Sequence, residues 1–235
     1  MRSPAPGPHA LAALLEAGLE EQAIVEELRT LLLVGHESTA CALAWALERL
    51  ARHPEVLERL RAGDGDYAEA VAREVLRSRP PVLDAVRLAT RPLELDGGIR
   101  LAAGTIVMAA PLLLHHRPDL YPAPERFRPE RFLIERPADG AYLPFGGGAR
   151  RCLGAQLALL ELKALLRVLA DGYALAPTGP ALERTRLIGT AVAPARGAEI
   201  TLSPSRSRRQ PGAAFSTAAS STATGGRSSL RWGRA

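Results

Sequence analysis

The sequence predicts a mainly α-helical fold with a small β-sheet. Two long segments, residues 20–52 and 153–169, carry apolar side chains around most of a helical circumference, which is typical of helices inside a core. Residues 93–101 hold two short apolar runs that flank an Asp-Gly-Gly turn, a pattern that predicts a β-hairpin. With 235 residues, 47% of them hydrophobic, the chain is long and apolar enough to bury a sizeable core.

Local signals place the remaining elements in chain order. Prolines open or close several of them, because proline suits a first helical position and cannot continue a helix. A Pro/Gly-rich lead precedes the first helix, and a proline-rich segment without periodicity predicts an ordered but irregular meander. The expected elements are a helix over 10–17, the long helix over 20–52, helices from Pro54 to near Gly63 and from Tyr67 to Ser78, strands at 93–95, 99–101 and 106–109, the meander over 118–144, the helix over 153–169, and a closing strand pair of 186–193 with 199–202.

Composition changes near the C-terminus. From residue 204 onward Ser, Ala, Thr, Gly and Arg dominate, which predicts a disordered basic tail over 204–235. We therefore expect an unstructured lead over 1–8, one folded unit over 9–203, and this tail. Six arginines and no acidic residue follow Glu199, and subtracting these six charges from the formal +5 leaves −1 for residues 1–199. The folded part is close to neutral, so the sequence does not predict nucleic-acid binding.

The two cysteines do not indicate a disulfide framework. Cys41 lies in an apolar helical run, Cys152 lies in a glycine-rich loop, and no secretory signal precedes them. The sequence therefore predicts a cytoplasmic protein. Charged residues interrupt each apolar segment within about 18 residues, so no membrane-spanning segment is expected.

The stretch from Phe145 to Gly154 is the strongest functional signal. It places Cys152 in a loop of glycines just before a long apolar helix, and Arg150, Arg151 and the first helical turn would favour the thiolate form that binds metals. A single cysteine in such a loop is more often a buried or incidental thiol. The loop lacks the Gly-Lys-Ser/Thr ending of a phosphate-binding loop, and Arg151 stands where a dinucleotide fingerprint needs its third glycine.

Four motifs together resemble the cytochrome P450 family. Phe-x-x-Gly-x-Arg-x-Cys-x-Gly over 145–154 resembles its haem-binding signature, and a Glu-x-x-Arg motif and a Phe-x-Pro-Glu-Arg-Phe motif lie upstream in the same order as in that family. Residues 35–39 resemble the oxygen-activating segment of the family's central helix. The resemblance runs from about residue 11 to 204 and covers the C-terminal, haem-binding half of the fold, so we expect the N-terminal half of that fold to be absent.

The resemblance implies haem b, iron protoporphyrin IX, with the Cys152 thiolate as axial ligand; such a ligand donates electron density to the iron. It also implies cationic or donor partners for the haem propionates, since guanidinium groups bind carboxylates well. His115 is a weaker candidate, and a structural histidine is an equal alternative there. The expected cofactor-binding residues are Gly35, Arg87, His115, Phe145, Gly148, Arg150, Cys152 and Gly154.

The central helix would face the other side of the haem. The resemblance gives Glu37, Ser38 and Thr39 catalytic roles in delivering protons during oxygen activation, and Gly35 leaves room for oxygen. A hydroxyl at Ser38 or Thr39 can bond the carbonyl oxygen four residues back and open the helix locally. Two positions depart from the family pattern, because serine replaces the usual threonine after the acid and Val34 replaces the small residue before Gly35. A merely distorted buried helix is the alternative.

Glu74 and Arg77 lie three residues apart and share a helix face. Such a pair is usually a solvated surface ion pair. In the family it joins an arginine of the meander, matched here by Arg131, in a buried network behind the haem. We therefore expect a structural role for Glu74, Arg77 and Arg131.

The function that follows is a haem-thiolate monooxygenase, which inserts one oxygen atom of O2 into a small organic, apolar substrate. The sequence has no flavin or iron–sulfur motif, so electrons would come from a separate ferredoxin or flavoprotein. Two alternatives stay open: a truncated or degenerate half-domain with weak or no haem binding, and a helical interaction protein. A polypeptide equivalent to the missing half is a further expected partner.

Overall fold

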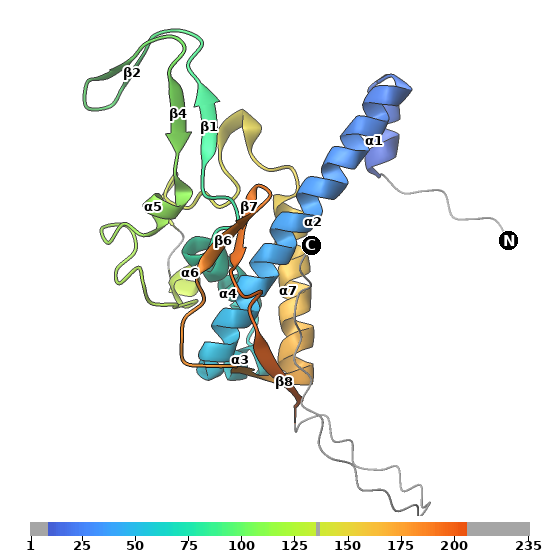
Figure 1. Ribbon diagram of the computed structural model, residues 1–235, viewed down its shortest axis with the longest axis vertical. Coiled ribbons are helices and arrows are strands. Elements are labelled where there is room, and N and C mark those ends of the chain that lie inside the picture. Colours follow the sequence, from blue (N-terminus) through green and yellow to red (C-terminus); the bar gives the residue numbers. More distant parts are fainter. Residues whose placement is uncertain (1–8, 135–136, 206–235) are drawn as a thin grey trace, which may run out of the picture.

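The computed structural model describes residues 9–134 and 137–205 (Figure 1). The fold is mainly helical with small β-sheets, as the sequence predicted. The helices are α1 (Ala10–Glu16), α2 (Glu21–Arg52), α3 (Pro54–Arg61), α4 (Tyr67–Ser78), α5 (Pro111–His115), α6 (Arg131–Ile134), the 3-10 turn η1 (Gly148–Arg150) and α7 (Ala155–Gly172). The strands are β1 (Ala85–Leu88), β2 (Leu93–Leu95), β3 (Ile99–Leu101), β4 (Ile106–Ala109), β5 (Tyr173–Pro177), β6 (Thr185–Ile188), β7 (Ala191–Pro194) and β8 (Ile200–Pro204).

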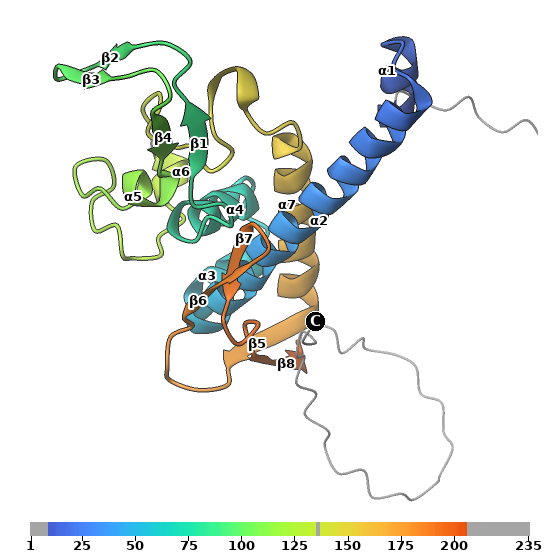
Figure 2. The ribbon, with the colours of Figure 1, turned by 45° about the horizontal axis from the view of Figure 1, so that its top comes forward.

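The core lies where the C-terminal half of α2 packs with α3, α4 and α7. Trp45 and Leu50 of α2, Val71 of α4, and Leu162 and Leu166 of α7 are fully or almost fully buried in one cluster. Each helix contributes one apolar face, and burial of these faces stabilises the helices more than their intrinsic propensity does. The long helices α2 and α7 cross in this region in both views (Figures 1 and 2).

The β-structure is divided into four separate antiparallel pairs, β1–β4, β2–β3, β5–β8 and β6–β7. The β2–β3 hairpin pairs Leu95 with Ile99 around the predicted Asp-Gly-Gly turn, where Gly97 and Gly98 have positive φ angles of 83° and 78°. Glycine adopts this conformation without steric cost, so the turn residues fix the register of the pair.

The predicted closing strand pair was wrong. Residues 186–193 do not form one strand that pairs with 199–202; they fold back on themselves as the β6–β7 hairpin, with Ile188 opposite Ala191. The reason is Gly189, whose φ of 52° turns the chain. The strand β8 instead pairs with β5, which the sequence did not predict, and it continues through Pro204, one residue beyond the expected end of the folded unit. The expected lead over 1–8 and the tail from 206 onward lie outside the described residues.

Helix α2 is continuous from Glu21 to Arg52, so the expected local opening near residues 35–39 is not present. Its N-terminal half extends beyond the core together with α1 (Figure 2). The sequence predicted no membrane-spanning segment, whereas among the described residues α2 is long and apolar enough to meet the length and composition criterion for one. Core helices meet the same criterion, and the C-terminal half of α2 is buried in the core.

Candidate functional site

The loop before α7 holds Cys152 at the protein surface. The Cys152 amide donates a hydrogen bond to the Phe145 carbonyl oxygen at 3.0 Å, which closes the loop, and Phe145 packs against the core. Gly146 and Gly148 have φ angles of 66° and 67°, a conformation that other residues rarely adopt. The thiol is free and exposed. The glycines therefore shape a tight loop that leaves one thiol exposed at the surface.

Exposed basic and apolar residues flank this thiol in the sequence, with Arg150 and Arg151 before it and Leu153 after it. Leu153, next to Cys152, is 92% exposed, and Leu157, in the first turn of α7, is also exposed. Further apolar side chains are exposed on a different element, α2, where Leu33 and Val34 immediately precede Gly35. Within residues 9–134 and 137–205 no group of three or more His, Cys, Asp or Glu side chains could hold a metal ion. A single thiol can complete the coordination of a metal whose other ligands come from a large organic cofactor. Haem is such a cofactor, and exposed apolar side chains suit its apolar ring.

Two glycines support this fit. Gly35 lies inside α2, where glycine is about 1 kcal/mol less favourable than alanine, and a Cβ added there would meet no neighbouring atom within 4 Å. A Cβ at Gly154 would meet only the Cys152 Sγ, at 4.0 Å. Neither glycine has a positive φ angle. Packing within the described residues requires glycine at neither position, whereas close approach of a ligand would.

Glu37, Ser38 and Thr39 lie on the half-buried part of α2. The Ser38 hydroxyl donates to the Val34 carbonyl oxygen at 2.9 Å, four residues back, without interrupting the helix. The Glu37 carboxylate lies against Gly189 in the β6–β7 turn. Thr39 is half-buried and follows on the next helical position. The structure therefore brings Glu37 to a β-turn that is distant in the sequence, a contact that sequence reasoning missed.

The structure brings Glu74, Arg77 and Arg131 together, the three residues that the family resemblance had grouped. Glu74 and Arg77 are fully buried on α4, and Arg77 donates to both carboxylate oxygens through Nε at 2.7 Å and Nη2 at 2.9 Å. Arg131 of α6 places its Nε 3.5 Å from Glu74 Oε1. A buried ion pair needs this kind of multiple contact to offset its desolvation.

The two arginines also hold the end of α5 and the meander to α4. Arg77 donates to the carbonyl oxygens of His115 and Pro124, both at 2.8 Å. Arg131 donates to the carbonyl oxygens of Pro122 at 2.6 Å and Ala123 at 2.7 Å. These bonds satisfy backbone groups of an irregular segment that has no ladder partners of its own. The network is thus a structural junction between one helix and the meander.

The three expected propionate partners differ in their surroundings. Arg150 is exposed in η1, three residues after Gly147, and Arg87 is exposed on β1, where its guanidinium donates to the Val86 carbonyl oxygen at 2.8 Å. His115 is fully buried: its Nε2 accepts the Leu143 amide at 2.9 Å and its ring stacks on Tyr142. Burial lowers the pKa of His115 to about 4, so the ring is neutral. This geometry favours the structural alternative for His115.

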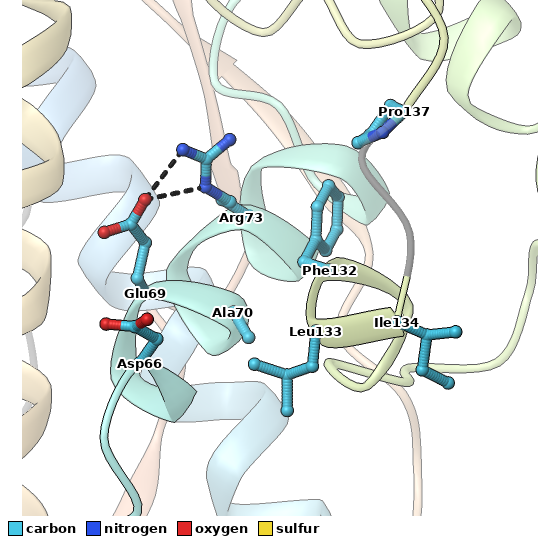
Figure 3. A pocket seen from close by; sticks show the side chains of 8 residues that line it. All are labelled: Asp66, Glu69, Ala70, Arg73, Phe132, Leu133, Ile134 and Pro137. Atoms are coloured by element: carbon cyan, nitrogen blue, oxygen red, sulfur yellow. Dashed lines mark hydrogen bonds and ion pairs between the residues drawn. The ribbon is translucent and has the colours of Figure 1, made fainter.

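A pocket of about 320 Å³ lies between α4 and α6 (Figure 3). Glu69 and Arg73 of α4 form an ion pair at 2.7 Å along one wall, and Phe132 and Leu133 of α6 form the other. Lys163 of α7 also binds Glu69, at 2.8 Å, and hydrogen bonds from Lys163 and then Arg73 lower the pKa of the Glu69 carboxyl. None of the lining residues belongs to the predicted site, and Glu69 and Arg73 already pair with each other. The pocket is therefore separate from the Cys152 loop.

Comparison with known proteins identifies relatives across most of the chain. The family model described as "Cytochrome P450" matches residues 9–63 and 64–181. The provisionally named cytochrome P450 135B1 of Mycobacterium tuberculosis is 42% identical over 198 residues, which are 80% of this chain and 42% of that protein. The provisionally named cytochrome P450 137 of the same species is 40% identical over 192 residues, 80% of this chain and 40% of that protein.

Solved structures show the same relationship. The structure of cyanobacterial CYP120A1 with bound retinoic acid has a TM-score of 0.72 at 27% identity, over 79% of this chain and 47% of that one. The haem domain of a cytochrome P450 mutant has a TM-score of 0.74 at 24% identity, which shows the fold alone. The chain thus spans less than half the length of the proteins that it matches.

Proposed function

The chain belongs to the cytochrome P450 family, and we propose that it supplies the haem-binding half of a haem-thiolate monooxygenase. The observation that carries the proposal is Cys152, an exposed thiol in a signature loop with apolar neighbours. In the proposed site Cys152 would hold haem b through its thiolate. When bound, haem of this type activates O2 so that one oxygen atom enters an organic substrate.

The other residues have separate roles in this proposal. Phe145, Gly148 and Gly154 shape the loop around the ligand, and Arg150 and Arg87 neutralise the propionates. Gly35 leaves space beside α2. Glu37 holds and passes on a proton at its carboxylate, with the Ser38 and Thr39 hydroxyls as neighbouring donors and acceptors. Glu74, Arg77 and Arg131 hold the meander and do not touch the reacting atoms.

The proposal includes partners that the chain itself does not supply. The substrate is a small apolar organic molecule, and a separate ferredoxin or flavoprotein delivers the electrons. Because the relatives are more than twice as long as their matched part, we also propose that polypeptide equivalent to their unmatched part covers the apolar side chains exposed on α2 and α7. The cytoplasmic location expected from the sequence stays part of the proposal and agrees with two unpaired cysteines.

The test is the spectrum of the purified, haem-supplemented chain after reduction and addition of carbon monoxide. Thiolate ligation predicts a strongly red-shifted Soret band in the parent protein and its loss in Cys152→Ala. The matched control is Cys41→Ala, which removes the other thiol and is expected to keep the band. No haem uptake, or an unchanged band in Cys152→Ala, would contradict thiolate ligation and leave the half-domain or interaction-protein alternatives.

A further inference from the structure

One face of α2 carries the β6–β7 hairpin. Glu37, Cys41 and Trp45 are spaced four residues apart and therefore lie along the same side of the helix. The Trp45 indole Nε1 donates to the Val192 carbonyl oxygen of β7 at 3.0 Å, inside the core. Cys41 packs with Ala191 and Ala193 of β7 and with Ile188. Residues on successive turns of α2 thus contact the hairpin along its length, from Val192 in β7 to Ile188 beside the turn.

Glu37 is the next residue in this series and meets the turn itself. A Cβ built on Gly189 would lie 2.7 Å from Glu37 Oε1 and 2.8 Å from Oε2, closer than real Cβ contacts. Gly189 also has a φ of 52°, which favours glycine. The carboxylate therefore lies directly against the α-carbon of Gly189. It occupies the space that a side chain at position 189 would need.

We propose that Gly189 is a positioning residue for the Glu37 carboxylate. This inference rests on the proposed function, in which Glu37 delivers protons. The hairpin backbone is fixed on both sides, because Val192 also donates its amide to the Pro81 carbonyl oxygen at 2.7 Å. The Glu37 carboxylate is the end of a flexible side chain. A side chain at position 189 consequently displaces the carboxylate before it displaces the hairpin.

Carboxyl ¹³C NMR of the protein with labelled glutamate tests this positioning without haem. The Glu37 signal is assigned as the one that disappears in Glu37→Gln. We expect this signal to move in Gly189→Ala and to keep its position in the matched control Gly98→Ala. Gly98 also has a positive φ, 78°, in a two-strand turn, but a Cβ there meets no atom within 4 Å. An unmoved Glu37 signal in Gly189→Ala would overturn the proposal.

Cys41 provides a second readout from the same face. Burial, and then the negative charge of Glu37, raise the pKa of the Cys41 thiol. Displacing the carboxylate lowers that pKa, so at fixed pH Cys41 is expected to be alkylated several-fold faster in Gly189→Ala and in Glu37→Gln. Combining the two substitutions is expected to give no further increase, because both act on Cys41 through the charge of Glu37. Peptide mass spectrometry separates Cys41 from the exposed Cys152. Additive rate increases would contradict the proposal and indicate general loosening of the hairpin.

Measurements on the haem-loaded protein distinguish failure of this inference from failure of the proposed function. In Gly189→Ala the reduced carbon monoxide band is expected to be unchanged, while a smaller fraction of the electrons consumed appears in product. A parent protein without the red-shifted band contradicts the proposed function but leaves the carboxyl signal as a test of the geometry. A normal band with equal electron yield in both proteins would overturn the positioning role alone.

Discussion

At the level of single residues, His115 links stability to pH. Its neutral ring accepts the Leu143 amide at 2.9 Å and packs between Tyr142 and Tyr121, with the Arg77 guanidinium bound to its carbonyl oxygen. Burial lowers its pKa from 6.5 to about 4. Between these values the unfolded chain binds more protons than the folded protein, so stability falls as the pH falls.

We therefore predict that the free energy of unfolding decreases by up to about 3 kcal/mol between pH 7 and pH 4 through this ring. The measurement is urea unfolding at a series of pH values. The control is His115→Gln, which keeps an acceptor for the Leu143 amide and does not titrate, and which is expected to flatten the curve between pH 6.5 and 4.5. Below that range protonation of Glu69 adds to the loss, because its pKa is lowered by Lys163 and Arg73. Equal slopes in both proteins would contradict the assignment.

Residues within one short motif were predictable, whereas contacts between distant segments were not. Phe145 and Cys152 lie seven positions apart, and the hydrogen bond between them closes a loop that the glycines alone indicated. Glu74, Arg77 and Arg131 were grouped through the family resemblance. The contact of Glu37 with Gly189 depends on where a hairpin packs, and no local pattern carries that information. The sequence did not decide whether His115 binds a propionate or has a structural role, because its position in the sequence says nothing about its burial.

At the level of elements, α4 and the meander depend on one buried ion pair. Replacing Arg77 with alanine leaves the fully buried Glu74 carboxylate without its main partner and frees the carbonyl oxygens of His115 and Pro124. We predict a loss of about 3–5 kcal/mol in the free energy of unfolding, because an uncompensated buried charge is costly. Urea unfolding at pH 7 measures it.

The matched control is Arg100→Ala in the β2–β3 hairpin. Arg100 pairs with Glu94 at 3.5 Å, and both side chains are exposed, so solvent screens the pair. We expect the urea midpoint of this variant to stay close to that of the parent protein. Similar losses of unfolding free energy in the two variants would mean that the Glu74 network stabilises the fold no more than a surface ion pair does.

Helix bounds followed from the sequence more closely than strand pairing. Pro54 marks the start of α3, and the Pro80-Pro81 pair marks the end of α4. Both signals are local, because proline restricts its own backbone and that of the residue before it. The β2–β3 turn is also local. The pairing of β5 with β8 joins segments on either side of the β6–β7 hairpin. Strand partners separated in this way cannot be chosen from alternation alone.

At the level of the whole molecule, the core accounts for only part of the apolar surface. The C-terminal half of α2 is buried, whereas Leu32, Leu33 and Val34 on its N-terminal half are exposed, as are Leu157 and Leu160 on α7. Contiguous exposed apolar surface is usually covered by a partner or a ligand. The length of the relatives agrees with this, since the chain spans about two fifths of each.

We predict that the isolated chain self-associates through these side chains. Sedimentation velocity over a range of protein concentrations is expected to show association in the parent protein and much less of it in Leu33→Glu combined with Leu157→Glu, because a charge on each helix must be desolvated in any contact. Ile99→Glu is the control: Ile99 is also exposed, but it lies on the β2–β3 hairpin, which contributes no residue to the main core. Association that weakens equally in the control would place the contact elsewhere, and a monomeric parent protein at all concentrations would contradict the prediction.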